Sequence, residues 1–242
     1  MKAFVLAAGL GTRLKPWTLS HPKALVPVGG VPMLERVIRR LEEEGFDRIV
    51  VNVHHFASQI TDFLGSRTWK ARVDISDETD LLLDTGGALL HAAPLLCEDD
   101  EPFLIHNVDI LSDAPLAFLM ETHIRLGGEA TLLVSCRDSS RHLLFDRGMR
   151  LRAWENIADG KRRGEPGDWP HSLAFSGIHV MNPSLVRRMA REGMPPVFPV
   201  MDYYLSHTRQ VPILGEICHG LRLIDIGKPE TLSRANSLFA GS

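Results

Sequence analysis

The sequence predicts an α/β protein in which a Rossmann-like mixed sheet lies between two layers of helices. Apolar runs of strand length alternate with segments of helical period, and the first run leads directly into a glycine loop. The 242 residues are 44% apolar and 24% charged, which supplies enough apolar side chains for a large core. No internal repeat divides the chain, so a single domain over residues 1–242 is expected.

The first half of the chain is predicted to alternate strands and crossover helices. A buried strand is expected at residues 2–8, followed by a long loop. Pro32 stands where the first turn of a helix tolerates proline, apolar side chains recur on one face from Leu34 to Leu41, and Gly45 ends this helix. Further strands are predicted at residues 48–53, 71–75, 102–107 and 130–136, and further helices at residues 57–64, 88–96 and 116–126.

The second half is predicted to contain shorter extended segments around a polar stretch. The polar stretch at residues 159–168 is rich in glycine and basic side chains, which predicts a mobile loop. Strands are predicted at residues 143–145, 151–154, 173–180, 211–214 and 221–224, and helices at residues 184–191, at residues 200–207 and from Pro229 onward. We expect this half to elaborate a ligand site that the first half begins.

The overall charge and the cysteine count exclude several classes of protein. The 27 Lys and Arg residues against 30 Asp and Glu residues give a formal net charge of -3, so the chain lacks the positive charge of a protein that binds nucleic acid or an anionic membrane. Three widely spaced cysteines suggest neither a disulfide framework nor a paired zinc site, which favours a reducing cytoplasm. No apolar stretch approaches the roughly 20 residues of a membrane span, and the N-terminal apolar run is too short for a signal peptide.

The glycine loop after the first strand, residues 6–16, is the most informative segment. Its small side chains and two glycines let backbone N–H groups approach a phosphate or a base, and Arg13 and Lys15 add positive charge. Leu14 occupies the place of the third glycine in a dinucleotide-binding fingerprint, and the Gly-Lys-Ser/Thr end of a P-loop is missing. Taken alone, a strand followed by such a loop is a tight turn about as often as a ligand loop.

A second segment, residues 22–34, contains a lysine between prolines that restrict the backbone around it. Alone, this Lys23 is most simply a solvated residue of a turn. Together, however, the two segments match Leu-Ala-Ala-Gly-x-Gly-Thr-Arg-x-x-Pro followed by Pro-Lys-x-Leu-x-Pro-Val at every fixed position. On these motifs the chain resembles the sugar nucleotidyltransferases, which are the nucleoside-diphosphate-sugar pyrophosphorylases, and the resemblance extends over nearly the whole chain.

The resemblance implies the fold of the nucleotide-diphospho-sugar transferases and a Mg²⁺-dependent reaction. In that reaction a sugar 1-phosphate takes a nucleotidyl group from UTP or GTP, and pyrophosphate leaves. Arg13 and Lys23 are implied as catalytic residues, residues 140–225 as the sugar-binding part, and no C-terminal β-helix domain is expected. The expected protein is a cytoplasmic monomer or homodimer with no nucleic-acid or membrane partner. The loop residues implied in nucleotide binding are Leu6, Ala7, Ala8, Gly9, Gly11 and Thr12.

Two aspartates are the candidates for the metal site. Asp109 ends a predicted buried strand in a segment that resembles the family's Asn-Gly-Asp, and Asp225 lies in a segment that resembles Asp-Ile-Gly-Thr-Pro-Glu. A carboxylate at the carboxyl end of a strand faces the crevice in which α/β sheets bind ligands, and oxygen ligands suit Mg²⁺. Either aspartate alone would equally well cap a following helix, and Val108 departs from the family's glycine.

The segment Asp84-Thr85-Gly86-Gly87 is predicted to open a helix, so its backbone donors are candidates for contacts with a base or ribose. As a bare sequence it is a capped helix start. It is closer to the Glu-Thr-Gly-Gly of N-acetylmuramate-1-phosphate uridylyltransferases than to the Gly-Thr-Ala-Gly of many guanylyltransferases. This favours uridine and a role in cell-wall synthesis, with a mannose-1-phosphate guanylyltransferase or another hexose-1-phosphate nucleotidyltransferase as the alternative.

Four residues are implied in binding the sugar. Ser176 and Gly177 match the family's Phe-Ser-Gly-Ile strand, for which a core strand with a packed serine is the competing interpretation. Asn107 begins the segment of the first aspartate, and Glu155 takes the place of the glutamate in the family's Glu-Lys-Pro.

Asn156 stands where the family has a lysine that contacts the sugar phosphate. Lys161 or Arg162 in the polar stretch are candidate substitutes for that lysine. The departures at Asn156 and Val108 also leave open a catalytically silent nucleotide-sugar sensor. A sensor, however, has no need of all four candidate catalytic and metal residues.

Overall fold

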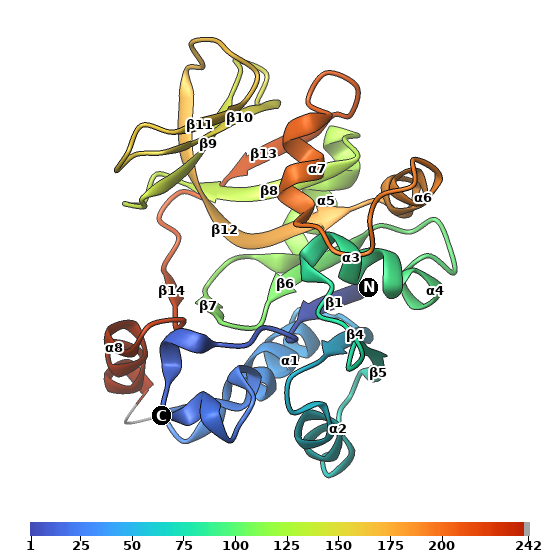
Figure 1. Cartoon of the computed structure of the whole chain (residues 1–242), viewed down its shortest axis with the longest axis vertical. Coiled ribbons are helices and arrows are strands. Elements are labelled where there is room, and N and C mark those ends of the chain that lie inside the picture. The colour runs from blue at the N-terminus through green and yellow to red at the C-terminus, as the bar shows by residue number, and fades with distance from the viewer. Residues whose placement is uncertain (240–242) are drawn as a thin grey trace.

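The structure, a computed structural model, describes residues 1–239. Its central sheet is parallel except for one long strand, which runs antiparallel to its neighbours (Figure 1). From one edge to the other, the strands are β5 (Arg72–Asp77), β4 (Arg48–Val53), β1 (Lys2–Leu6), β6 (Phe103–Asn107), the antiparallel β12 (His171–Met181), β8 (Ala130–Ser135) and β13 (Ile213–Ile217). This mixed sheet confirms the predicted fold class.

Side chains of the central strands alternate between two hydrophobic cores, one on each face of the sheet. Val5 of β1 enters one core and the adjacent Phe4 enters the other, and Val51 and Val50 of β4 divide in the same way. The core with Val5 is covered by α1 (Met33–Glu43), α2 (Ala57–Gly65) and α5 (Leu116–Leu126). The core with Phe4 is covered by α3 (Asp84–His91), α4 (Ala93–Leu96), α6 (Pro183–Arg191) and α7 (Val200–Ser206). The two predicted helical layers are therefore present.

A smaller antiparallel sheet is joined to the central one through β12. Residues 171–173 of β12 pair with this smaller sheet, and residues 178–181 pair with β6. The register between β12 and β8 is interrupted from Phe175 to His179, where the strand bulges. The smaller sheet continues from β12 through β9 (Arg141–Phe145), β10 (Leu151–Asn156) and β11 (Arg162–Gly164).

Short elements gather where β1 and β6 end. Three single-turn 3-10 helices follow β1, and β2 (Pro27–Val28) then pairs with β3 (Val31–Pro32). After β6, β7 (Ile110–Ser112) pairs antiparallel with β14 (Leu223–Asp225), and α8 (Pro229–Phe239) follows. Because Asp225 is in register with Ile110, this ribbon carries the last part of the chain back to the end of β6.

Two predicted elements differ from the structure. The helix expected at residues 88–96 is two helices: α3 begins at Asp84, and α4 begins at Ala93 with Pro94 in its first turn, because proline lacks the N–H that would continue the α3 hydrogen bonds. The mobile loop expected at residues 159–168 is wrong for Arg162–Gly164, which form β11 and pair with β10. Backbone pairing there outweighs a loop-like composition.

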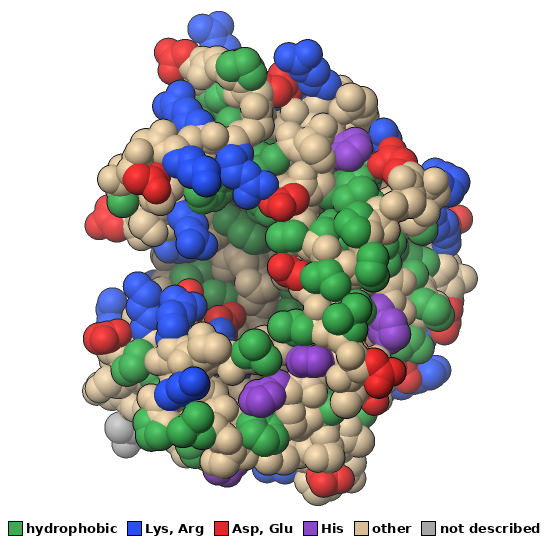
Figure 2. Space-filling model, in the orientation of Figure 1, with side chains coloured by type: hydrophobic (Ala, Val, Ile, Leu, Met, Phe, Trp, Pro, Cys, Tyr) green, Lys and Arg blue, Asp and Glu red, His purple; other side chains and the backbone are tan. Residues whose placement is uncertain are grey.

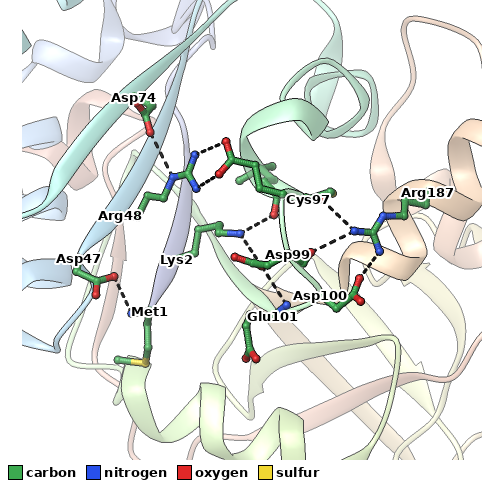
Figure 3. A network of polar contacts seen from close by, with 12 residues as sticks. Met1, Lys2, Asp47, Arg48, Asp74, Cys97, Asp99, Asp100, Glu101 and Arg187 are labelled. Atoms are coloured by element: carbon green, nitrogen blue, oxygen red, sulfur yellow. Dashed lines mark hydrogen bonds and ion pairs between the residues drawn. The ribbon is translucent and has the colours of Figure 1, made fainter.

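The amino ends of the central strands are closed by ion pairs (Figure 3). The buried Lys2 Nζ donates to the Leu96 carbonyl and to Asp99 Oδ1, both at 2.9 Å. Arg48 of β4 forms ion pairs with Glu98 at 2.5 Å and with Asp74 at 3.3 Å. Carboxylates therefore neutralise the cations at the amino ends of the strands. The carboxyl ends of the strands are left for a ligand. No helix within residues 1–239 combines the length and apolar character of a membrane span.

Candidate functional site

A hollow opens at the carboxyl ends of β1 and β6. Figure 2 shows it between the smaller antiparallel sheet above and the loops after β1 below, with Lys and Arg side chains on its rim and acidic side chains nearby. Carboxyl ends of parallel strands are the usual place for a ligand in an α/β sheet. The predicted nucleotide loop, residues 6–16, enters this region directly from β1.

Asn52 of β4 holds the backbone of the glycine loop. Its Oδ1 accepts hydrogen bonds from the N–H of Ala7 at 2.6 Å and of Ala8 at 3.2 Å, and its Nδ2 donates to Glu78 Oε1 at 2.9 Å. The N–H groups of Ala7 and Ala8 are therefore already hydrogen-bonded. Gly9 lies in open space, because a Cβ placed on it would meet no described residue within 4 Å apart from its chain neighbours. The sequence interpretation missed Asn52, although an amide inside the apolar run of residues 48–53 was a visible signal.

Glu78 is a second residue that the sequence interpretation missed. Its side chain is buried, and its Oε2 has no hydrogen-bond partner among the residues that the structure describes. Burial is the main cause of a raised pKa for this carboxyl, and the hydrogen bond from Asn52 acts in the opposite direction. A buried polar residue beside the loop thus supports the backbone of Ala7 and Ala8 through Asn52.

The two sequence motifs touch each other at Gly11 and Lys23. Gly11 has a φ of +61°, and a Cβ on it would lie 2.8 Å from Lys23 Cβ and 3.0 Å from Thr18 Cγ2. Only glycine accepts both this conformation and this approach. The hydroxyl of Thr18 also donates to the Gly11 carbonyl at 3.0 Å. The glycine is required because the chain brings the lysine segment against the loop.

Three of the four predicted catalytic and metal residues lie around Gly227, and the fourth, Lys23, is paired with one of them. Lys23 Nζ forms an ion pair with Asp109 Oδ2, and both side chains are largely buried. A Cβ on Gly227 would lie 2.9 Å from Arg13 Nη2, 2.8 Å from Asp225 Oδ1 and 3.5 Å from Asp109 Oδ2. The Ile226 N–H also donates to the Asp109 carbonyl at 3.0 Å. Residues far apart in the sequence thus form one cluster of two cations and two carboxylates.

The two carboxylates fit a magnesium ion that is completed by a substrate. Mg²⁺ is usually held by one or two protein carboxylates together with water and substrate phosphates. Asp109 and Asp225 approach the same point beside Gly227, and residues 1–239 contain no group of three or more acidic, His or Cys side chains that would bind a metal without substrate. Two carboxylates would suit a metal ion whose remaining ligands come from water and a substrate.

Asn107 and Gly177, two of the residues expected to bind the sugar, lie against each other. Gly177 has a φ of +77°, and a Cβ on it would lie 2.8 Å from Asn107 Nδ2. Ser176 is different from the expectation: its side chain is 1% exposed, and its hydroxyl accepts a hydrogen bond from the Ile178 N–H at 3.2 Å. The competing interpretation of a packed serine applies, because the hydroxyl satisfies backbone inside the β12 bulge.

The turn between β10 and β11 engages the remaining sugar-side candidates. Glu155 accepts hydrogen bonds from Arg162 Nε and from the Ser172 hydroxyl, each at 3.0 Å. Asn156 Oδ1 accepts from the Ala158 N–H at 3.1 Å, inside the turn. The charge of Arg162 is thus committed to Glu155, and Asn156 serves the turn, while Lys161 is exposed.

The helix start at Asp84 packs against the segment before α7. The N–H groups of Gly86 and Gly87 both donate to the Phe198 carbonyl, at 2.8 and 3.4 Å, and the Val200 N–H donates to Thr85 Oγ1 at 2.9 Å. The predicted helix start is confirmed, but these two amides are not free donors for a base or ribose. The two glycines are explained by close packing instead.

Arg137 is a further residue of this region that the sequence interpretation missed. It follows β8 by two residues, and its Nη2 donates to the Phe175 carbonyl, in the β12 bulge, at 2.7 Å. Burial is the first cause of a lowered pKa for this guanidinium, and the charge of Asp225 acts in the opposite direction. The sequence contains no specific signal for Arg137, because a polar residue after a strand is a common pattern.

A family model described as nucleotidyl transferase matches residues 2–145 of the chain. The chain is 37% identical over 191 residues to mannose-1-phosphate guanylyltransferase 1 of Arabidopsis thaliana, which covers 78% of this chain and 52% of that protein. It is 28% identical over 246 residues to the mannose-1-phosphate guanylyltransferase catalytic subunit beta of Drosophila melanogaster, which covers 100% of this chain and 63% of that protein. The chain therefore spans only 52% and 63% of the lengths of these curated relatives.

A solved structure supports the fold independently. The crystal structure of HddC from Yersinia pseudotuberculosis matches with a TM-score of 0.79 and 24% sequence identity, over 98% of this chain and 99% of that chain. At this identity the likeness concerns the fold alone. It extends beyond the residues of the family match and includes the smaller antiparallel sheet.

Proposed function

The chain belongs to the nucleotidyl transferase family, and from this membership we propose that it transfers a guanylyl group from GTP to a hexose 1-phosphate of the mannose type, releasing pyrophosphate. The single observation that carries the reaction class is the cluster of Arg13, Lys23, Asp109 and Asp225 beside Gly227. The choice of GTP and mannose 1-phosphate rests on the two guanylyltransferases to which the chain is similar.

The chemistry needs positioning more than it needs a base. An oxygen of the sugar phosphate attacks the α-phosphorus of the triphosphate and is already anionic, so no residue has to remove a proton from it. Arg13 would neutralise the departing pyrophosphate, and Lys23 would lie between the sugar phosphate and the α-phosphate. Fixed charges of this kind accelerate phosphoryl-type transfers through alignment and charge neutralisation.

Asp109 and Asp225 would hold the Mg²⁺ ion. When bound, the ion would neutralise negative charge on the α-phosphate. In the free protein, Lys23 forms an ion pair with Asp109. Asp109 therefore has a cationic partner before substrate binds, and the metal ion would be its partner afterwards.

A uridylyltransferase is the weaker alternative. The uridine interpretation depended on Asp84-Thr85-Gly86-Gly87, and the glycine amides of that segment donate to Phe198. The segment is thus accounted for by the packing of α3. The curated relatives described above transfer guanylyl groups according to their names, which supports the guanylyl alternative over the uridylyl one.

A matrix of substrates tests the proposal. Pyrophosphate release would be measured with Mg²⁺ for GTP, UTP, ATP, CTP and dTTP against mannose 1-phosphate, glucose 1-phosphate and N-acetylmuramate 1-phosphate. We expect GTP with mannose 1-phosphate to have the highest kcat/KM. A preference for UTP with N-acetylmuramate 1-phosphate would overturn the choice of base and sugar, and silence of every pair would favour the nucleotide-sugar sensor.

Asp109→Asn and Lys23→Ala test the charged cluster. Each change removes a charge that would face a phosphate or the metal, so kcat should fall by about 10²- to 10³-fold while the protein stays folded. Pyrophosphate release and thermal unfolding would be measured together. Lys70→Ala is the matched control, because Lys70 is an exposed lysine outside the cluster. Near-normal turnover in either cluster variant would remove the assignment.

A further inference from the structure

The sugar side of the cluster lacks an obvious cation for the acceptor phosphate. A sugar 1-phosphate brings a second strongly anionic group into the hollow, in addition to the triphosphate. Asn156, at the place of the family's lysine, is neutral, and its side-chain oxygen is used inside the β10–β11 turn. Arg162, one candidate substitute, is paired with Glu155 at 3.0 Å. A different residue has to be sought for this charge.

Arg137 lies at the junction between the two sheets, beside the sugar-side residues. Its guanidinium donates to the Phe175 carbonyl at 2.7 Å, where the β12 bulge begins. Two residues further along the same bulge, Gly177 lies against Asn107, and a Cβ on Gly177 would approach Asn107 Nδ2 to 2.8 Å. Asn107 in turn is two residues from Asp109. A series of contacts through the β12 bulge therefore leads from Arg137 to the carboxyl end of β6, where Asp109 follows.

The guanidinium of Arg137 is half-buried and forms no ion pair within residues 1–239, although the charge of Asp225 acts on it from the metal side of the cluster. Its nitrogen atoms contact only backbone carbonyls, of Phe175 at 2.7 Å and of Asp138 at 3.5 Å, and its buried Nε has no partner within residues 1–239. Other buried or half-buried arginines, such as Arg48 and Arg152, form ion pairs with carboxylates. A half-buried cation without a direct ion pair is unfavourable, and an anionic ligand in contact with it would relieve that cost.

The position of Arg137 beside Phe175 and its positive charge both suit an anionic ligand. We propose that Arg137 binds the phosphate group of the sugar 1-phosphate, from the wall of the hollow formed by β8 and β12, in place of the lysine that Asn156 replaces. The proposal rests on the proposed nucleotidyl transfer. A guanidinium suits the position because it presents several donors at once, so it keeps its bond to Phe175 and still offers N–H groups to phosphate oxygens.

Steady-state kinetics of Arg137→Gln and Arg137→Lys test this role. Glutamine keeps a donor for the Phe175 carbonyl but removes the charge, whereas lysine keeps the charge. Arg137→Gln should raise the KM for mannose 1-phosphate about ten- to a hundredfold, as expected for a lost charge-assisted hydrogen bond, and leave the KM for GTP within about twofold. Arg137→Lys should recover most of the loss. Arg147→Gln, which removes an exposed arginine on the β9–β10 turn, is the matched control.

Three results would overturn the proposal and are distinguishable. If the wild type is active and Arg137→Gln leaves the KM for the sugar phosphate unchanged, Arg137 is not the phosphate ligand, and a raised KM in Lys161→Gln would then assign that role to Lys161. If Arg137→Gln raises both KM values, lowers thermal stability and is not rescued by lysine, Arg137 only supports the bulge. If the wild type turns over no pair of substrates, the proposed function itself fails, and this role fails with it.

Discussion

At the scale of single residues, the site depends on where side chains are absent. Gly227 contributes no side chain, and Arg13 and Asp225 use the space that one would fill, with Asp109 in contact beside it. Gly11 plays the same part for Lys23. The resemblance to family motifs predicted these charged residues as the site, and the structure explains the glycines beside them: a side chain at Gly11 or Gly227 would take the space that the charged side chains use.

Gly227→Ala should lower turnover with little effect on stability. The added Cβ would lie 2.8 Å from Asp225 Oδ1 and 2.9 Å from Arg13 Nη2, so one or both exposed side chains must move. A displacement of about 1 Å in a catalytic group costs about 10²-fold in rate. We expect that loss in kcat for pyrophosphate release and an almost unchanged Tm. Gly65→Ala is the control, because a Cβ there meets nothing within 4 Å; equal activities of the two variants would contradict the crowding argument.

At the scale of elements, side chains on neighbouring strands hold the backbone of the loop that contains the first motif. The glycine loop leaves β1, but Asn52 on β4 fixes its backbone, and Glu78 after β5 fixes Asn52. Strand positions were predictable from apolar runs. The partners across strands were not, because a hydrogen bond between side chain and backbone of different elements leaves no periodic pattern. The pairing of β11 escaped prediction because its glycine-rich and basic composition is typical of a loop.

Asn52→Ala should weaken both the fold and nucleotide binding. The change leaves the Ala7 and Ala8 N–H groups without their buried acceptor, and each unsatisfied buried donor costs about 1–3 kcal/mol. The free energy of unfolding, measured with denaturant, should therefore fall by about 2 kcal/mol or more, and the KM for the triphosphate should rise. Ser76→Ala is the control, because the buried Ser76 hydroxyl on β5 has no hydrogen-bond partner within residues 1–239. An unfolding free energy equal to that of the control would show that Asn52 does not hold the loop.

At the scale of the whole molecule, the fold buries imidazoles that the site does not use. Burial lowers the pKa of His106 to about 4 and of His179 to about 3. Both rings are therefore neutral in the folded protein, whereas in the unfolded chain they would take a proton near pH 6.5. A lowered folded pKa means that the stability is fully present above pH 6.5 and is lost as the pH falls toward the folded values.

His179→Phe should reduce this acid sensitivity. His179 packs against the rings of Phe175 and Tyr204, and neither of its nitrogens has a partner among the described residues, so a phenylalanine fits the apolar surroundings. From pH 8 to pH 5, the wild type should lose about 2 kcal/mol of unfolding free energy through this one group. Denaturant unfolding at both pH values would show a smaller loss in the variant. In the exposed control His219→Gln the loss should stay as in the wild type, and an equal loss in His179→Phe would contradict the assignment.

The sequence by itself determined the mixed α/β class, most strands and helices, and the four charged residues Arg13, Lys23, Asp109 and Asp225. The strands and helices follow from local periodicity, and the four charged residues were proposed from four segments that resemble motifs of the family. Only the tertiary structure decided that the four form one cluster beside Gly227, with Lys23 joined through Asp109, that Asn52 holds the glycine loop, and that the Gly86 and Gly87 amides are already occupied. The physical reason is that each of these facts depends on contacts between segments distant in the chain, and such contacts are set by how the sheet and its two helical layers pack.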